Sequence, residues 1–287
     1  VPVKVTDGFA AVKVTDGKSS VITELGATAQ AKDQGTGVYQ QTKVVEVEGE
    51  KIAVPDVTKP AVAVIKDQTA EETIILAVPG DKDKDGNPIT VANVIASGMS
   101  EGDAIKVYNS DGQYLWWEYD GSAWAARAPN PTKADSYQLA AGTAFWYTRA
   151  KGNTNPIVVV AAYQAELTTE IKDVPAKPGD EAAWNLVANA NPTEAFDVDK
   201  IQNTEETKND KIIVPLKGLA QRTLTRQGGK WGYIGLVKQE IRPGKFSWVN
   251  AWIECGEEER KIDPGKGFWY LSNGGKPTFN WGKGDGK

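Results

Sequence analysis

Short runs in which apolar and polar residues alternate cover most of the chain, and this two-residue period is that of a β-strand. Residues 105–108 and 114–119 are two such runs, and Asn109-Ser110-Asp111-Gly112 between them favours a hairpin turn. Residues 157–160 form a continuous apolar run of the kind that suits a buried strand. The pattern therefore predicts an all-β protein.

Two segments of the chain share a series of motifs in the same order, which indicates an internal repeat. The closing motif carries the strongest match, with AGTAFWY at residues 141–147 and PGKGFWY at residues 264–270. Three further pairs of blocks align: 73–78 with 184–189, 102–107 with 209–214, and 119–124 with 226–231. The spacing between copies changes from block to block, which places loops between the blocks and the larger insertion around residues 237–260. Short helical turns are expected at matching points, 91–97 and 194–202.

These observations predict two tandem copies of a small antiparallel β-sandwich or barrel, preceded by a strand-rich extension. The expected division is an N-terminal extension at 1–70, a first repeat at 71–164, a linker at 165–181 and a second repeat at 182–287. In the extension, residues 44–47 and 52–54 predict a hairpin around Glu48-Gly49-Glu50.

Composition and charge narrow the classes of function. The chain has 287 residues, a net charge of −5 and a pI near 5.1, so it lacks the basic surface that nucleic-acid binding needs. No stretch approaches the ~18 consecutive apolar residues of a membrane span. Because the chain begins with Val1, we expect a mature secreted protein whose signal peptide has been removed.

The residue types also argue against an enzyme. Histidine is absent, which removes the commonest general acid/base and every nucleophile that depends on it. The single cysteine, Cys255, excludes an internal disulfide and a thiolate zinc site. Carboxylates such as Asp197 and Asp199 leave a glycan hydrolase as an alternative, since such an enzyme needs two acids across one cleft. We predict a protein that is not an enzyme.

One loop has the composition of a calcium site. In Asp81-Lys82-Asp83-Lys84-Asp85-Gly86-Asn87, carboxylates occupy alternate positions and a glycine allows a sharp turn. The predicted ligands are Asp81, Asp83, Asp85 and Asn87. Pro88 and Ala92 depart from the calcium-loop pattern, because Ala92 stands where a bidentate glutamate belongs. The sequence predicts either no cofactor, with this loop as a solvated turn, or structural calcium.

Tryptophans form the second group of candidate site residues. Trp116, Trp117 and Trp252 are predicted to form an aromatic contact or ligand platform. Trp116 and Trp117 are adjacent in a strand, so one of the two rings faces away from the core. An exposed ring of this kind binds either a sugar or another subunit, while the remaining aromatic residues fill the core.

The N-terminal valines suggest a mode of assembly. Val1, Val3, Val5, Val12 and Val14 alternate with other residues as in a strand. Such a strand either adds to an open sheet edge of a neighbouring subunit, which builds a filament, or completes a sheet within its own chain.

The second repeat resembles a known type of module. It opens with Trp184-Asn185-Leu186-Val187 and closes with Pro264-Gly265-Lys266-Gly267-Phe268-Trp269-Tyr270, and the first repeat is a diverged version. This series is similar to a repeated β-module of secreted and cell-surface bacterial proteins of unknown function. The resemblance implies export and a cell-surface setting and implies no activity.

The function expected from the sequence combines these points. We predict a non-catalytic extracellular structural protein that self-associates, such as a filament or surface-layer subunit. The alternative is a carbohydrate-binding cell-surface module that uses exposed tryptophans.

Overall fold

The structure, a computed structural model, describes residues 3–4, 11–15, 18–22, 35–47, 50–56, 58–109, 111–164, 167–170, 183–201, 208–215, 221–273 and 278–280. Over this range the protein is all-β, as predicted, and its strand pairs are antiparallel. Two 3₁₀ turns, η1 (Val198–Lys200) and η2 (Glu258–Arg260), are the helical elements of these residues. None of the described segments forms a helix with the length and apolarity of a membrane crossing.

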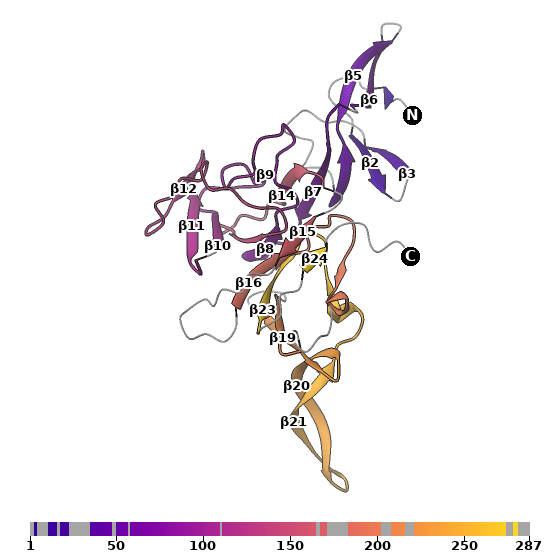
Figure 1. The fold of residues 1–287 in the computed structure, drawn as a ribbon, viewed down its shortest axis with the longest axis vertical. Coiled ribbons are helices and arrows are strands. Elements are labelled where there is room, and N and C mark those ends of the chain that lie inside the picture. The colour runs from indigo at the N-terminus through magenta and orange to yellow at the C-terminus, as the bar shows by residue number, and fades with distance from the viewer. Residues whose placement is uncertain are drawn as a thin grey trace.

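Two sheets pack face to face around the largest core (Figure 1). The first-repeat sheet has the order β12-β11-β10-β13-β8 and consists of β8 (Thr73–Ala77), β10 (Ala104–Tyr108), β11 (Tyr114–Tyr119), β12 (Trp124–Ala126) and β13 (Ala144–Thr148). The N-terminal sheet has the order β3-β2-β4-β7-β14-β9 and consists of β2 (Ala11–Thr15), β3 (Lys18–Ile22), β4 (Gly37–Gln40), β7 (Ala61–Asp67), β9 (Ile95–Ser97) and β14 (Ile157–Ala162).

The predicted extension supplies four of the six strands of the N-terminal sheet. β7 pairs with β14 from Val62 opposite Ala162 to Asp67 opposite Ile157, so the extension and the first repeat share one sheet. Ile65 of β7 then packs in the same core as Phe145 of the facing sheet. The sequence predicts the apolar strand at 157–160, and its pairing with β7 joins residues 90 to 100 positions apart.

The second repeat forms its own sheet with a separate core. Its order is β16-β23-β18-β19-β20-β21, and its members are β16 (Ala183–Ala188), β18 (Lys211–Pro215), β19 (Gln221–Gln227), β20 (Lys230–Arg242), β21 (Lys245–Glu254) and β23 (Gly267–Ser272). Two small sheets supply further strands: β15 (Thr168–Glu170) with β24 (Thr278–Asn280), and β17 (Phe196–Asp197) with β22 (Lys261–Ile262). Phe196 and Phe279 from these sheets pack on Phe268 in the second core.

The two repeat sheets have the same strand order at the positions that the sequence aligns. β8, β13, β10, β11 and β12 correspond in turn to β16, β23, β18, β19 and β20. A buried hydrogen bond also recurs, because Tyr147 donates to Asp103 in the first repeat and Tyr270 donates to Asp210 in the second. Burial, followed by this carboxylate, raises the pKa of each tyrosine above its usual range, so both hydroxyls stay protonated.

The two repeat sheets meet at β8 and β16 through reciprocal contacts. Leu76 forms an isolated bridge with Lys266, and Val187 forms one with Thr143. In the sequence alignment Leu76 corresponds to Val187, and Thr143 corresponds to Lys266. Contacts that exchange partners in this way are those of a two-fold arrangement.

The glycines of the second closing motif are explained by this junction. A Cβ on Gly267 would lie 2.2 Å from Cγ2 of Ile75, and one on Gly265 would lie 2.3 Å from Cγ2 of Ile65. Gly265 also has a φ of +75°, which favours glycine. The motif therefore lets the second repeat approach both β8 of the first repeat and β7 of the N-terminal sheet closely.

Two hairpins lie at opposite ends of the long axis (Figure 1). At one end, β1 (Val3–Lys4), β6 (Glu50–Pro55) and β5 (Thr42–Val47) form a three-stranded sheet, in which the strands predicted at 44–47 and 52–54 pair with each other. At the other end, the predicted insertion at 237–260 forms most of the β20–β21 hairpin and continues through η2.

The N-terminal strands pair within their own chain. β1, which contains Val3, pairs with β6, and β2, which contains Val12 and Val14, lies between β3 and β4. Both edges of β2 are thus paired within the chain, which is the arrangement of the intrachain alternative, and donation of this strand to a neighbouring subunit stays a prediction. Val1 and Val5 lie outside the described residues.

Candidate functional site

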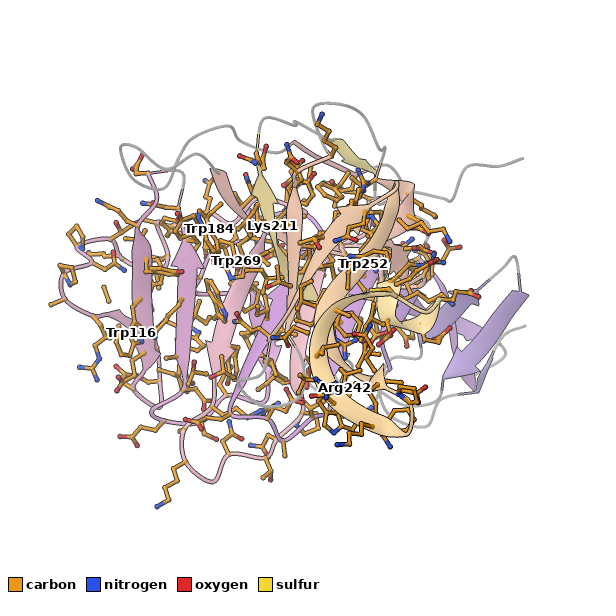
Figure 2. All side chains as sticks on the ribbon, turned by 90° about the horizontal axis from the view of Figure 1, so that it is seen from below. Trp116, Trp184, Lys211, Arg242, Trp252 and Trp269 are labelled. Carbon is orange, nitrogen blue, oxygen red and sulfur yellow. The ribbon has the colours of Figure 1, made fainter. Side chains whose placement is uncertain are left out.

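A row of aromatic side chains crosses the outer face of the two repeat sheets (Figure 2). It arises from alternation in β13 and β23, where Phe145 and Tyr147 are buried and Trp146 points to the other face. We call this set the aromatic face; its members are Tyr108, Tyr114, Trp116, Trp146, Trp184 and Trp269.

Ring contacts connect most of the aromatic face across the junction. Trp146 lies 5.2 Å from Trp269, measured between ring centroids, and Trp269 lies 5.5 Å from Trp184. On the first-repeat side Tyr114 is 5.5 Å from Trp146 and Tyr108 is 5.1 Å from Trp269. These spacings are those of favourable tilted and edge-on aromatic pairs. The face is therefore a continuous surface, and Trp269 is buried in its centre.

One end of the aromatic face is hollowed into a pocket of about 420 Å³. Its lining is made by Thr73, Lys106, Tyr114, Trp116, Arg127, Ala128, Pro129, Asn130, Trp146 and Thr148. Ligand pockets typically combine apolar walls with a few polar groups that fix orientation, and this lining has that composition. Its volume also falls within the ~300–1,000 Å³ of small-molecule sites.

The strand register arranges the pocket's central residues. Lys106 stands opposite Trp116 on one side and opposite Trp146 on the other, so the lysine lies between the two rings. Its Nζ is 4.5 Å from the centre of the Trp116 ring. No ion pair joins Lys106 to a carboxylate of the described chain. A positive charge is thus held at an aromatic wall.

The pocket rim is anchored to β11. The Asn130 side-chain amide donates to the Trp116 carbonyl at 3.2 Å, and the Arg127 backbone N–H donates to the same oxygen at 2.9 Å. The Arg127 guanidinium is held by Glu118, which accepts from Nε at 2.9 Å and also from Nη2. These bonds fix the rim beside Trp116 before any ligand binds.

Two of the three predicted platform residues take other positions. Trp117 is fully buried and donates from Nε1 to the Thr132 carbonyl at 2.8 Å, so its place in the platform was wrong. Trp116, its neighbour, is the ring that faces out, with 41% of its surface exposed. Trp252 is half-buried on the β20–β21 hairpin, far along the sheet from the pocket. Tyr114 and Trp146 were missed as platform residues, although the alternation of β13 indicates an outward ring.

The predicted calcium ligands mostly bind groups of their own chain. Asp83 accepts from the backbone N–H groups of Asp85 and Asn87 at 2.8 and 2.9 Å, and Asp81 accepts from that of Ala141 at 2.7 Å. Asp85 is paired with Lys84. Within the part of the chain that the structure describes, no group of three or more acidic or cysteine side chains is placed to hold a metal. Calcium binding stays a prediction from sequence.

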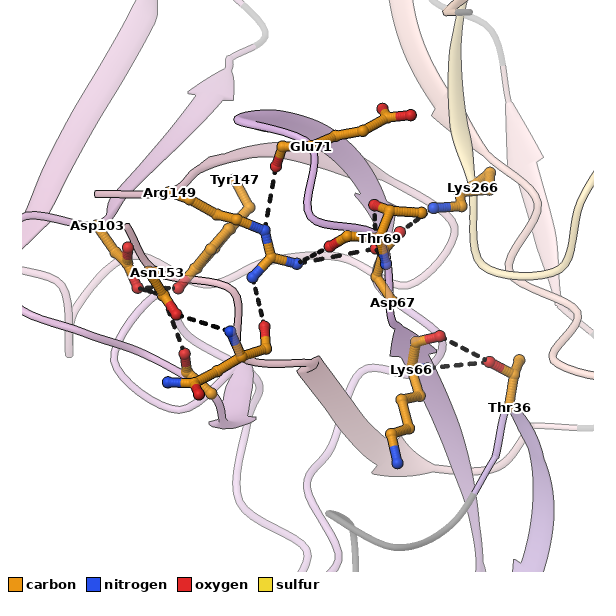
Figure 3. Close-up of polar contacts among 12 residues, drawn as sticks. Thr36, Lys66, Asp67, Thr69, Glu71, Asp103, Tyr147, Arg149, Asn153 and Lys266 are labelled. Carbon is orange, nitrogen blue, oxygen red and sulfur yellow. Dashed lines mark hydrogen bonds and ion pairs between the residues drawn. The ribbon is translucent and has the colours of Figure 1, made fainter. Parts of the chain in front are cut away.

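A buried polar cluster joins the N-terminal sheet to both repeats (Figure 3). Asp67 forms an ion pair with Lys266, and its carboxylate also lies 3.8 Å from Arg149. Arg149 donates to the carbonyls of Thr69 and Asn155 at 2.8 and 2.5 Å. Burial alone would raise the pKa of Asp67, but Lys266 and Thr69 outweigh burial and lower it. Asp67 and Arg149 both bind groups of the chain itself, so we assign this cluster a structural role.

The other side chains with catalytic potential are either paired with a cation or buried. Asp197 and Asp199 both face Arg260, the former at 3.7 Å. Cys255 is buried, and burial raises the pKa of its thiol to about 11, which makes it a poor nucleophile near neutral pH.

Comparisons with protein-family models, curated proteins and solved structures find no match to this chain.

Proposed function

We propose that the protein is a non-catalytic carbohydrate-binding protein whose pocket stacks an acidic sugar against Trp116 and Trp146. The observation that carries the proposal is the concave aromatic end of the outer face, where two tryptophans flank a lysine. Flat apolar faces of sugar rings pack on indole, while their hydroxyls need polar partners at the edge. Asn130, Thr73 and Thr148 supply polar atoms in the lining.

The charges of the pocket favour an acidic sugar over a neutral one. Its charged lining residues are Lys106 and Arg127, and Glu118 already balances the arginine. A carboxylate or sulfate on the ligand would therefore meet Lys106 beside the indole.

Binding rather than hydrolysis is favoured by the same lining. The described residues that line the pocket include no aspartate or glutamate, whereas glycoside hydrolysis requires two carboxyls across the scissile bond. The proposal includes a location at the cell surface, which the resemblance of the repeat motif implies.

The test is an array of acidic and neutral oligosaccharides, followed by calorimetric titration of the tightest ligand. We expect Trp116→Ala to weaken binding by tenfold or more, since central tryptophans dominate interface energies. Trp184→Ala, which removes an exposed ring of the same face outside the pocket, should leave affinity unchanged.

A second pair of variants tests the charge. Lys106→Met should reduce affinity for acidic sugars and spare neutral ones, and exposed Lys211→Met is its control. An array on which no sugar is retained, or binding that survives Trp116→Ala, would overturn the proposal.

A further inference from the structure

The β20–β21 hairpin carries apolar side chains that its own chain leaves in solvent. Ile234, Leu236, Phe246 and Trp248 are all more than half exposed, and Trp248 is 66% exposed. In the strand register Ile234 faces Trp252, and Leu236 faces Asn250, so these residues share one face of the hairpin. Lys238 and Glu240 stand opposite Trp248 and Phe246 on this face. Exposed apolar side chains gathered on one face in this way mark an interaction site.

β21 is also an unprotected sheet edge. It is the last strand of the second-repeat sheet, and β20 is its partner among the described strands. Its charged residues, Lys245 and Glu254, stand at its two ends, and it contains no proline. Edge strands in monomers are normally blunted by such residues, and an edge that lacks them between its two ends is a template for pairing.

The order of side chains in β21 identifies the partner. The segment Trp248-Val249-Asn250-Ala251-Trp252 is nearly symmetric about Asn250, with a tryptophan two residues away on each side and a small apolar residue, Val249 or Ala251, next to it. Antiparallel pairing of two such strands about Asn250 would set Trp248 against Trp252, Val249 against Ala251, and Asn250 against itself. In this register each residue and the residue opposite it in the second copy lie on the same face of the joined sheet, and no like charges stand opposite each other. A two-fold interface requires this self-complementarity.

We propose that β21 pairs antiparallel with β21 of a second copy about a two-fold axis at Asn250. The hairpin projects from the body of the molecule, so its edge is open to a second copy (Figure 1). Because the contact is confined to one hairpin per chain, the dimer should dissociate on dilution, unlike an obligate dimer with a large interface. This proposal is independent of sugar binding.

Sedimentation velocity of the full chain over a hundredfold range of concentration tests the association. We expect a monomer–dimer equilibrium that Trp248→Lys shifts to monomer by at least tenfold in Kd, with Asn250→Lys as a second variant. Ile241→Lys is the matched control, because Ile241 is a similarly exposed residue of the hairpin outside β21. Thermal melting checks that each variant is folded.

Cysteine cross-linking tests the register in a Cys255→Ala background. Asn250→Cys should form a disulfide-linked dimer faster than Lys245→Cys, because only residue 250 meets its own copy. A chain that stays monomeric throughout, a dimer unaffected by Trp248→Lys, or cross-linking that does not favour residue 250 would each overturn the proposal. A monomer whose hairpin variants lose binding to phosphatidylcholine–phosphatidylserine vesicles would assign the apolar face to lipid instead.

Discussion

At the scale of the single residue, Asp67 depends on a distant part of the chain, since Lys266 balances its buried charge. Breaking a fully buried ion pair costs ~3–5 kcal/mol. The Lys266 side chain is 34% exposed, so we expect Lys266→Met to lower the free energy of unfolding by about 1–2 kcal/mol. Urea denaturation at pH 7 measures this, and Lys230→Met, which breaks an exposed pair with Glu254, should change it by less than ~0.5 kcal/mol.

The pH dependence of the same variant separates charge pairing from packing. Because the folded state lowers the pKa of Asp67, its contribution is fully present above the ordinary carboxyl pKa of ~3.9 and is lost as pH falls through the lower folded value. Lys266→Met removes the main cause, so less stability should be lost between pH 5 and acid in the variant than in the parent. An equal loss of stability in both proteins would show that the ion pair between Asp67 and Lys266 makes no electrostatic contribution to stability.

The sequence predicts single residues well where alternation decides their environment. Adjacent Trp116 and Trp117 require one buried ring and one outward ring, and the structure has that arrangement. Which ring faces out depends on the register of β11 against β10, and the pocket further depends on the rim loop near Asn130. Strand register and loop position depend on tertiary structure, which the local sequence pattern does not contain. For this reason Trp117 was wrongly assigned to the aromatic platform.

At the scale of elements, the closing motif fixes how tightly the repeats join. Gly267→Ala would place a Cβ 2.2 Å from Ile75 Cγ2 and 2.9 Å from Ala144 Cβ, so we expect a loss of about 1–3 kcal/mol from overpacking. Adding Ile75→Ala should make the substitution at Gly267 less costly than it is alone. Gly256→Ala, whose nearest contact is 3.7 Å, is the neutral control in the same denaturation series.

The turn residues predict which neighbouring strands form hairpins. Pairing between strands that are distant in the sequence could not be predicted. The turn predicted between the runs 105–108 and 114–119 joins β10 to β11. By contrast, nothing in the apolar run predicted at 157–160 indicates that β14 pairs with β7. Long-range pairing follows from burial of whole faces, which is why the extension was expected to be separate.

For the whole molecule, the two cores exchange residues at the junction. Ala188 of the second repeat lies in the first core, and Ala141 of the first repeat lies in the second. We therefore expect both repeats to unfold in one cooperative transition, with calorimetric and van't Hoff enthalpies that agree. Scanning calorimetry measures this, and two resolved transitions would mean that the repeats are energetically independent.

The pocket and the β20–β21 hairpin lie toward opposite ends of the joined repeat sheets, because β8 and β16 meet in the middle and leave β12 and β21 outermost. Two chains paired through β21 would hold their pockets far apart and directed outward. Such a dimer is bivalent, and on a polymer with regularly spaced sugars the second contact forms at a high effective concentration. Avidity for the polymer would then exceed affinity for its monosaccharide. The spacing of the acidic sugars along the polymer would decide which polymers the dimer binds through both pockets.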